Sequence, residues 1–238
     1  MDRNSDTYLN AEQIGKRFPE YRKTYDFPGA YINESHRSYA ECPLISDTLI
    51  DVGIQGWLRR ADALKLYEMG YFTKGDVLEF GTYQGLSTSI LSRANYDSGL
   101  LRNIYSVDID RSFQDIAKNN LKERDLAKNV HFHLSDSHDF LSSMQEKGKK
   151  FGFVFIDHSH EFEPVFDVCR HLEDLLLMGG FCLFHDYNDP NSFDFSTKDF
   201  KVYQAVNEGL DKGRFGFYGI FGCTVLYRLC TRENQRNE

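Results

Sequence analysis

The sequence has no long apolar run, so it offers no segment that would cross a membrane as a helix. Such a helix needs about 20 consecutive, mainly apolar residues, and no stretch of the 238 residues approaches that length. The first ten residues, MDRNSDTYLN, also lack the apolar core of a secretory signal peptide. From these absences we expect no membrane partner and a cytoplasmic location.

Cysteine is scarce, and the chain has no excess of positive charge. The five cysteines form no C-x-x-C pair and are typical of buried thiols in a reducing compartment: Cys42, Cys169, Cys182, Cys223 and Cys230. The net charge of −8 argues against a general nucleic-acid-binding surface. The apolar content of 41% can build a full core, and we find no internal repeat. The composition indicates one globular domain with additions.

The most informative segment is VLEFGTYQGLSTSIL, residues 77–91. A short apolar run leads through Glu79 into a turn that holds Gly81 and Gly85, and apolar residues then follow at helical spacing. This pattern predicts a strand, a glycine-rich turn and a helix whose free N–H groups face a ligand. Glu79 would repel a pyrophosphate and attract an ammonium or sulfonium group. The spacing is G-x-x-x-G, not the G-x-G-x-x-G of dinucleotide sites.

Four further predicted strands end in polar or acidic residues. They cover residues 103–107, 130–134, 151–156 and 181–184, and helical patterns separate them. The segments that follow are Asp108-Ile109-Asp110, Ser135-Asp136-Ser137-His138, Asp157-His158-Ser159-His160 and His185-Asp186-Tyr187-Asn188-Asp189. The carboxyl ends of parallel strands line one crevice, where ligands bind. An acid after a single strand can instead cap the next helix, but five such ends favour a binding site.

These motifs, in this order, resemble the class I S-adenosylmethionine-dependent methyltransferases. The similarity is greatest to metal-dependent O-methyltransferases of the catechol and macrolide-sugar kind, and it spans about residues 57 to 230. VLEFGTYQGLST resembles their first motif, SVDID their ribose-binding motif, FIDHSHEFEPV their I-D-G-x-H segment, and GGFCLFHDY the strand with a second metal ligand. The resemblance implies an α/β, Rossmann-like, doubly wound, seven-stranded sheet, mostly parallel with an antiparallel last strand. Residues 215–218 and 223–228 fit its final hairpin.

The resemblance also implies a cofactor site for S-adenosylmethionine. Asp108 is the candidate for the ribose hydroxyls, because a carboxylate can accept from both hydroxyls at once. His138 resembles the adenine-edge position, although a solvated residue at a helix start is an equal alternative. The complete set of expected cofactor-binding residues is Glu79, Gly81, Tyr83, Gly85, Ser87, Asp108, Asp136, Ser137, His138 and Asp157.

A divalent cation and a general base are expected between the fourth and fifth strands. Asp157 and Asp186 offer two carboxylates for Mg²⁺ or Mn²⁺. Relatives place an acidic or amide ligand beside the second aspartate, where this chain has His185 or Tyr187. Of these two we name His185 as the third ligand, with Asn188 and Asp189 as alternatives. An imidazole ligand would favour Mn²⁺ over Mg²⁺. His160 is the candidate general base, since neutral imidazole suits proton removal near pH 7.

Residues 1–50 are expected to form an N-terminal arm or lid, and residues 51–238 the methyltransferase domain. The arm interleaves aromatic and charged residues, and three prolines interrupt it. In the resembled family such elements cover the cofactor and shape the acceptor pocket; packing on the sheet or on a second subunit is the alternative. The segment Ile50 to Met69 predicts one or two helices, from the apolar spacing of Leu58, Ala61 and Leu64.

The function predicted from the sequence is metal-assisted O-methylation of a small molecule that carries a hydroxyl group. Two alternatives stay open at this stage. One is a metal-independent N- or C-methyltransferase, in which Asp157 and Asp186 serve structure or substrate binding. The other is a non-catalytic nucleotide-binding Rossmann protein, against which Glu79 and the missing G-x-G-x-x-G count. The sequence also leaves a homo-oligomer open.

Overall fold

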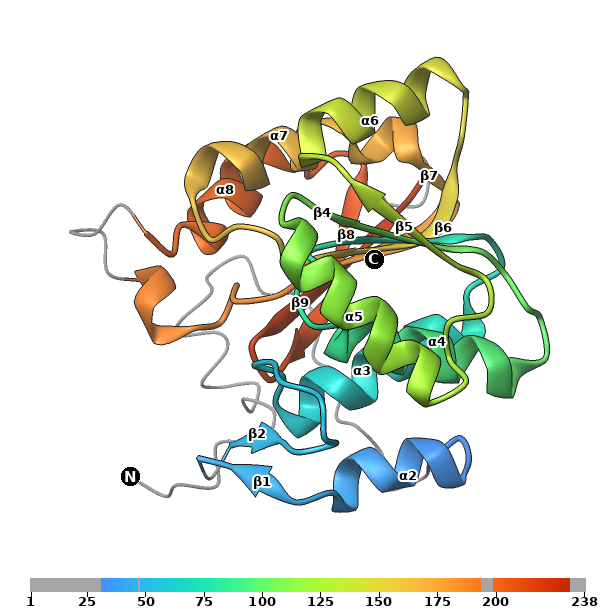
Figure 1. The fold of residues 1–238 in the computed structure, drawn as a ribbon. Coiled ribbons are helices and arrows are strands. Elements are labelled where there is room, and N and C mark those ends of the chain that lie inside the picture. The colour runs from blue at the N-terminus through green and yellow to red at the C-terminus, as the bar shows by residue number, and fades with distance from the viewer. Residues whose placement is uncertain (1–30, 47, 194–198, 232–238) are drawn as a thin grey trace.

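The computed structural model describes residues 31–46, 48–193 and 199–231, and its centre is a seven-stranded β-sheet (Figure 1). From one edge to the other the strands are β5 (Val130–Leu134), β4 (Ile104–Asp108), β3 (Val77–Phe80), β6 (Phe151–Ile156), β7 (Leu176–Phe184), β9 (Thr224–Leu229) and β8 (Phe215–Phe221). Strands β3 to β7 pair in parallel, and β9 is antiparallel to both neighbours. The predicted fold class is confirmed.

Helices cover both faces of the sheet (Figure 1). One face carries α3 (Arg60–Phe72), α4 (Leu86–Ser98) and α5 (Arg111–Glu123); the other carries α6 (Ser137–Glu146), α7 (Phe162–Leu175) and α8 (Val202–Gly209). Each layer buries its own apolar cluster, and the side chains of β6 alternate between the two: Phe153 and Phe155 face one cluster, and Val154 and Ile156 the other. A short 3-10 helix, η1 (Pro190–Phe193), follows β7.

Backbone hydrogen bonds continue the sheet just beyond the last residues of its central strands. Gly81 N–H donates to Val107 C=O, Asp157 N–H to Phe80 C=O, and His185 N–H to Ile156 C=O, at 2.8 to 3.0 Å. These bonds join the loops after β3, β4, β6 and β7 at one edge of the sheet. Ser135 N–H likewise donates to Asp108 C=O at 3.0 Å, so the fold brings all the predicted ligand-binding segments together.

One helix prediction is wrong at its start. Residues 50–59 are not helical: Leu49–Ile50 form β2, which pairs with β1 (Leu44–Ile45), and α3 begins only at Arg60. Gly53 adopts a φ of +73°, which interrupts a helix. Asp62 then fixes the true start, because its carboxylate accepts a hydrogen bond from Arg59 N–H at 2.9 Å.

The described part of the N-terminal arm packs against α3. Helix α2 (Glu34–Glu41) is held by Asn33, which hydrogen-bonds with the Tyr67 hydroxyl at 2.7 and 3.0 Å. The buried ring of His36 stacks on Tyr67 with centroids 5.2 Å apart. The prediction for residues 1–30 lies outside the described residues. Among the helices that the structure describes, none has the length and apolarity to span a membrane.

Candidate functional site

Two neighbouring cavities open at the carboxyl ends of the parallel strands. The larger measures about 700 Å³ and the smaller about 310 Å³. Four residues line both: Gly81, Asp108, Ile109 and His158. The larger cavity extends toward Trp57, Asp186 and Phe200, whereas the smaller extends along the start of α6. The shape therefore suits one extended ligand that runs from the smaller cavity into the larger one.

The glycine turn after β3 admits no side chain at its first glycine. Gly81 has a φ of +96°, and a Cβ there would lie 2.1 Å from the carbonyl oxygen of Asp157. Gly85 has a φ of +88° at the N-cap of α4, where a Cβ would press against α5. The two glycines thus let the loops after β3 and β6 touch and turn the start of α4 toward the cavity.

Asp108 fixes this turn from the end of β4. Its Oδ2 accepts hydrogen bonds from the N–H groups of Thr82 (3.0 Å) and Tyr83 (2.8 Å), and its Oδ1 accepts from Asp110 N–H (2.8 Å). The carboxylate also lies where the two cavities meet. Asp108 therefore shapes the turn and still has lone pairs for a ligand hydroxyl.

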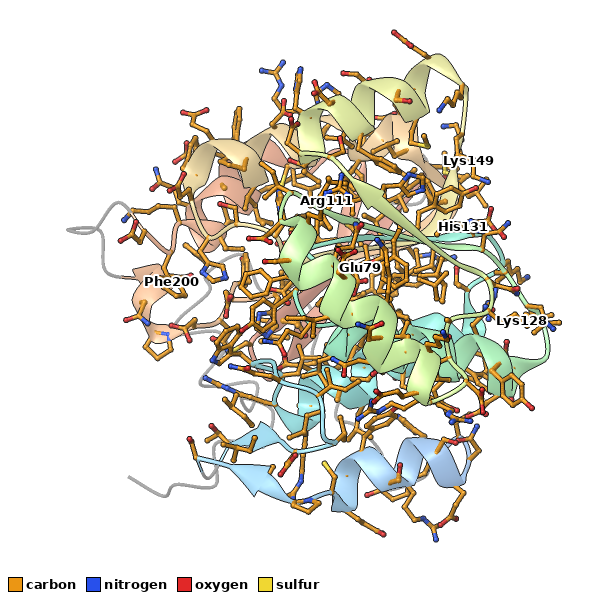
Figure 2. The ribbon with its side chains drawn as sticks, viewed as in Figure 1. Glu79, Arg111, Lys128, His131, Lys149 and Phe200 are labelled. Atoms are coloured by element: carbon orange, nitrogen blue, oxygen red, sulfur yellow. The ribbon has the colours of Figure 1, made fainter. Side chains whose placement is uncertain are left out.

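Glu79 lies behind the turn, in the middle of the fold (Figure 2), and has no exposed surface. Its Oε2 accepts hydrogen bonds from the hydroxyls of Thr88 and Ser106, both at 2.6 Å. Burial raises its pKa to about 7, although these hydroxyls favour the charged form. The structure therefore places Glu79 one layer beneath the cavity lining, where a cation in the turn would favour its ionised form.

The remaining expected cofactor residues line the two cavities. Asp136, Ser137 and His138 border the smaller one, and Tyr83, Ser87 and Asp157 border the larger. Asp136 caps α6 by accepting from Asp139 N–H at 2.9 Å. His138 is exposed, and its Nδ1 lies 3.0 Å from Asp167 Oδ2; this hydrogen bond raises the pKa of His138.

The loops after β6 and β7 bring two carboxylates and two imidazoles together. His160 Nε2 lies 2.8 Å from Asp186 Oδ2. His185 Nδ1 lies 3.1 Å from both Asp157 Oδ1 and Asp186 Oδ2. Behind His185, its Nε2 lies 3.8 Å from an oxygen of the buried Asp62 on α3. No lysine or arginine pairs with Asp157 or Asp186 among the residues that the structure describes.

The charges in this cluster shift its pKa values in opposite directions. The hydrogen bond to Asp186 raises the pKa of His160. Burial lowers that of His185, but the charges of Asp157 and Asp186 outweigh it and raise the pKa well above its usual value. Burial by itself would raise the pKa of Asp186, but the two imidazoles hold this pKa far below its usual range. His185 and Asp186 therefore stabilise each other's charged forms.

Three ligand atoms, one each from Asp157, His160 and Asp186, lie within 4.8 Å of one another and fit around one metal ion. We predicted that His185 would lie with the two aspartates in this group, but the histidine found there is His160. The ring of His185 lies between the two aspartates and Asp62. Asn188 faces elsewhere, since its Nδ2 donates to Gly222 C=O at 2.9 Å. Asp189 borders the cavity near Arg59.

Several residues that form the walls of the larger cavity were not among the predicted site residues. Trp57, the chain's single tryptophan, has 58% of its surface exposed, and its ring lies 5.0 Å from that of Tyr83. Phe113 packs on the other side of Tyr83 at 4.4 Å. Phe200 stacks on His160. In the sequence, the one feature that could have pointed to them is the single tryptophan, which stands just before α3.

Comparison with known proteins shows what the central part of the chain is similar to. Residues 78–187 match a family model described as a methyltransferase domain. This part of the chain is therefore similar to a methyltransferase domain. The match spans β3 to the loop after β7, so it includes both the glycine turn and the Asp157–Asp186 cluster. The match and the strand order agree with the predicted resemblance to S-adenosylmethionine-dependent methyltransferases. No curated protein matches the sequence.

Solved structures of methyltransferases share the fold of this domain. The O-methyltransferase TomG from Streptomyces achromogenes, in complex with S-adenosylmethionine, is 19% identical; the match covers 83% of this chain and 86% of TomG, with a TM-score of 0.59. An O-methyltransferase from Bacillus cereus, in complex with S-adenosylhomocysteine, is 18% identical over 70% and 78% of the two chains (0.56). One from Thermotoga maritima is 12% identical over 76% and 69% (0.54).

Proposed function

We propose that this methyltransferase domain transfers a methyl group from S-adenosylmethionine to a hydroxyl oxygen of a small molecule, with the help of a divalent cation. The observation that carries the proposal is the cluster of Asp157, His160 and Asp186 on the wall of the larger cavity. Solved O-methyltransferases with this fold hold S-adenosylmethionine or S-adenosylhomocysteine, which supports the choice of cofactor.

The adenosine part of the cofactor would occupy the smaller cavity, and its methionine part would extend past the glycine turn. Asp108, where the cavities meet, would accept hydrogen bonds from the ribose hydroxyls. The N–H groups at the start of α4 would face the carboxylate of the cofactor. The buried Glu79 would place a negative charge beneath the positive sulfonium.

The donor set fits a divalent cation. Two carboxylates and one imidazole converge, and their partners among the described residues are imidazoles, with no competing lysine or arginine. An imidazole donor favours Mn²⁺ over Mg²⁺. When bound, such a cation lowers the pKa of a hydroxyl that it contacts and stabilises the developing alkoxide. Asp157 and Asp186 would hold it, and His160, beside them, would act on the acceptor.

We assign His160 the role of general base. Its side chain is 42% exposed and lines the cavity, so an acceptor hydroxyl can reach its ring. The hydrogen bond to Asp186 raises its pKa and orients the ring, as a carboxylate does for a catalytic histidine. His158 cannot share this role: burial lowers its pKa to about 4, so it is a weak base at neutral pH.

The acceptor is proposed to be a small molecule. The larger cavity of about 700 Å³ is within the range that encloses a drug-sized ligand. Its lining is rich in carboxylates and contains one arginine, Arg59, which lies 4.0 Å from Asp189. Such a lining gives no support to a nucleic-acid substrate. A cytoplasmic location stays part of the proposal, supported by five cysteines that are all free thiols.

A second candidate function is methyl transfer without a cation. The observation that favours it is that Asp157 and Asp186 already have imidazole partners, so His160 and Asp186 resemble a self-sufficient acid–base pair. Dialysis against a chelator, followed by assay with a panel of hydroxylated acceptors, separates the two. The cation-assisted mechanism predicts loss of activity and recovery with Mn²⁺ or Mg²⁺; full activity in excess chelator supports the second candidate.

A further inference from the structure

Phe200 has a backbone conformation that aromatic residues rarely adopt. Its φ is +57°, in the left-handed region where a side chain crowds the backbone. Phe200 lies on the segment before α8, at the edge of the molecule opposite Lys149 and His131, which flank the other ends of the strands (Figure 2). Strain of this kind persists only when surrounding contacts hold it, and it is concentrated at functional sites.

The contacts that hold Phe200 go to His160. The two rings stack with centroids 4.5 Å apart and planes inclined by 28°. The next residue, Lys201, donates its N–H to the carbonyl oxygen of His160 at 2.5 Å. The segment before α8 therefore contacts the loop after β6 at His160, whose ring stacks on Phe200 and whose backbone carbonyl accepts from Lys201.

His160 needs such support. Its imidazole is 42% exposed and, among the residues that the structure describes, has one side-chain hydrogen bond, to Asp186. A partly exposed ring can rotate to other side-chain rotamers. The stacked Phe200 covers one face of the ring and limits this rotation, while it also lines the cavity. A displacement of about 1 Å at a reacting group costs about 10²-fold in rate, so this limit matters for catalysis.

We propose that Phe200 is a positioning residue: its ring holds His160 beside Asp186, in the orientation needed to take the proton from the acceptor. The proposal rests on the function proposed above for His160. It concerns residues of two separate loops, so it also means that the segment before α8 must lie against the loop after β6 for the base to be in place.

Three variants test this role: F200L removes the flat ring, F200Y keeps it, and F200G removes the ring while it relieves the backbone strain. We expect kcat to fall about 10- to 100-fold in F200L and F200G, with the Kd of S-adenosylmethionine unchanged within about twofold. F200Y should retain most of the activity. F72L is the matched control, because Phe72 is 60% exposed at the far end of α3. Equal kcat in F200L and wild type would overturn the proposal.

An NMR measurement separates this proposal from the proposed function. The ring protons of His160, assigned by their loss in H160Q, should show one set of nuclear Overhauser contacts in wild type and F200Y. In F200L and F200G these contacts should change, because the ring is no longer held in one orientation beside Asp186. If no acceptor is methylated but the contacts change in F200L, the proposed function fails and the positioning role stands. If wild type is active and the His160 contacts are the same in F200L, the positioning role fails. If F200L does not fold, the same comparison is made with F200G, because glycine adopts this backbone conformation without strain.

Discussion

His160 Nε2 lies 2.8 Å from Asp186 Oδ2, although the two residues belong to loops that follow different strands. The register of β6 and β7, in which Ile156 pairs with Phe184, sets this distance. Asp186 has a positive φ of 57°, which turns its side chain back toward the cavity. The pair joins the predicted base to one of the two predicted metal-binding carboxylates.

Removal of the His160 imidazole should affect the chemical step and spare cofactor binding. We expect H160A to lower kcat about 10²–10⁴-fold, the typical contribution of a positioned general base. The Kd of S-adenosylmethionine should stay within about twofold, because His160 borders only the larger cavity. Assays at several Mn²⁺ concentrations provide the control: full rescue by excess Mn²⁺ would show that His160 serves the cation and not the acceptor proton.

Loss of the Asp108 carboxylate should weaken cofactor binding. D108A removes the acceptor of two turn N–H groups as well as the expected partner of the ribose. Hydrogen bonds to charged groups contribute about 1.5–3 kcal/mol, so the Kd should rise about 10- to 150-fold in a calorimetric titration. D115A is the matched control, because Asp115 lies on the exposed surface of α5 and lines neither cavity. Equal affinities of D108A and wild type would remove Asp108 from the cofactor site.

The buried Glu79 should make stability depend on pH. Its pKa of about 7 exceeds the usual 4.5, so the folded protein binds this proton more tightly than the unfolded chain does. The contribution of Glu79 to the free energy of unfolding is therefore greatest below pH 4.5. It decreases by about 3 kcal/mol as the pH rises through 7. E79Q removes the effect. The difference between urea-unfolding free energies of E79Q and wild type should grow from pH 4.5 to 8; a constant difference contradicts the assignment.

Arg102 should be important for stability away from the site. It is 8% exposed, and its guanidinium donates to the carbonyls of Gly70, Tyr71 and Thr73 at the end of α3. A positive group there satisfies the free carbonyls and the helix dipole. We expect R102A to lower the free energy of unfolding by about 3 kcal/mol or more. R93A, which breaks a partly exposed ion pair on α4, should cost about 1 kcal/mol or less.

Much of the fold could be predicted because apolar runs alternate with helical patterns along the chain. β5 and β6 begin and end at the predicted residues. β7 begins at Leu176, five residues before the predicted start, because Gly179 and Gly180 are accommodated within an irregular strand. The helix before β3 was predicted too early, since apolar spacing in residues 50–59 mimics a helix that Gly53 interrupts.

The candidate site was only partly predictable. The carboxylates and His160 stand directly after strands, so the sheet geometry determined that they would meet. The positions of Trp57 and Phe200 depend on segments without regular structure, which carry no periodicity to interpret. Which histidine faces the two aspartates depends on side-chain orientation, which the sequence does not carry; in the structure His185 also contacts the buried Asp62, whereas His160 lies with the aspartates in the candidate metal group.

A calorimetric titration with S-adenosylmethionine, repeated with Mn²⁺ present and with NAD⁺ as the competing ligand, tests the central claim most directly. We expect one S-adenosylmethionine site per chain, a separate Mn²⁺ site that D157N abolishes while cofactor affinity is largely retained, and no comparable binding of NAD⁺. Tighter binding of NAD⁺ than of S-adenosylmethionine would show that the cavities do not form a site for S-adenosylmethionine.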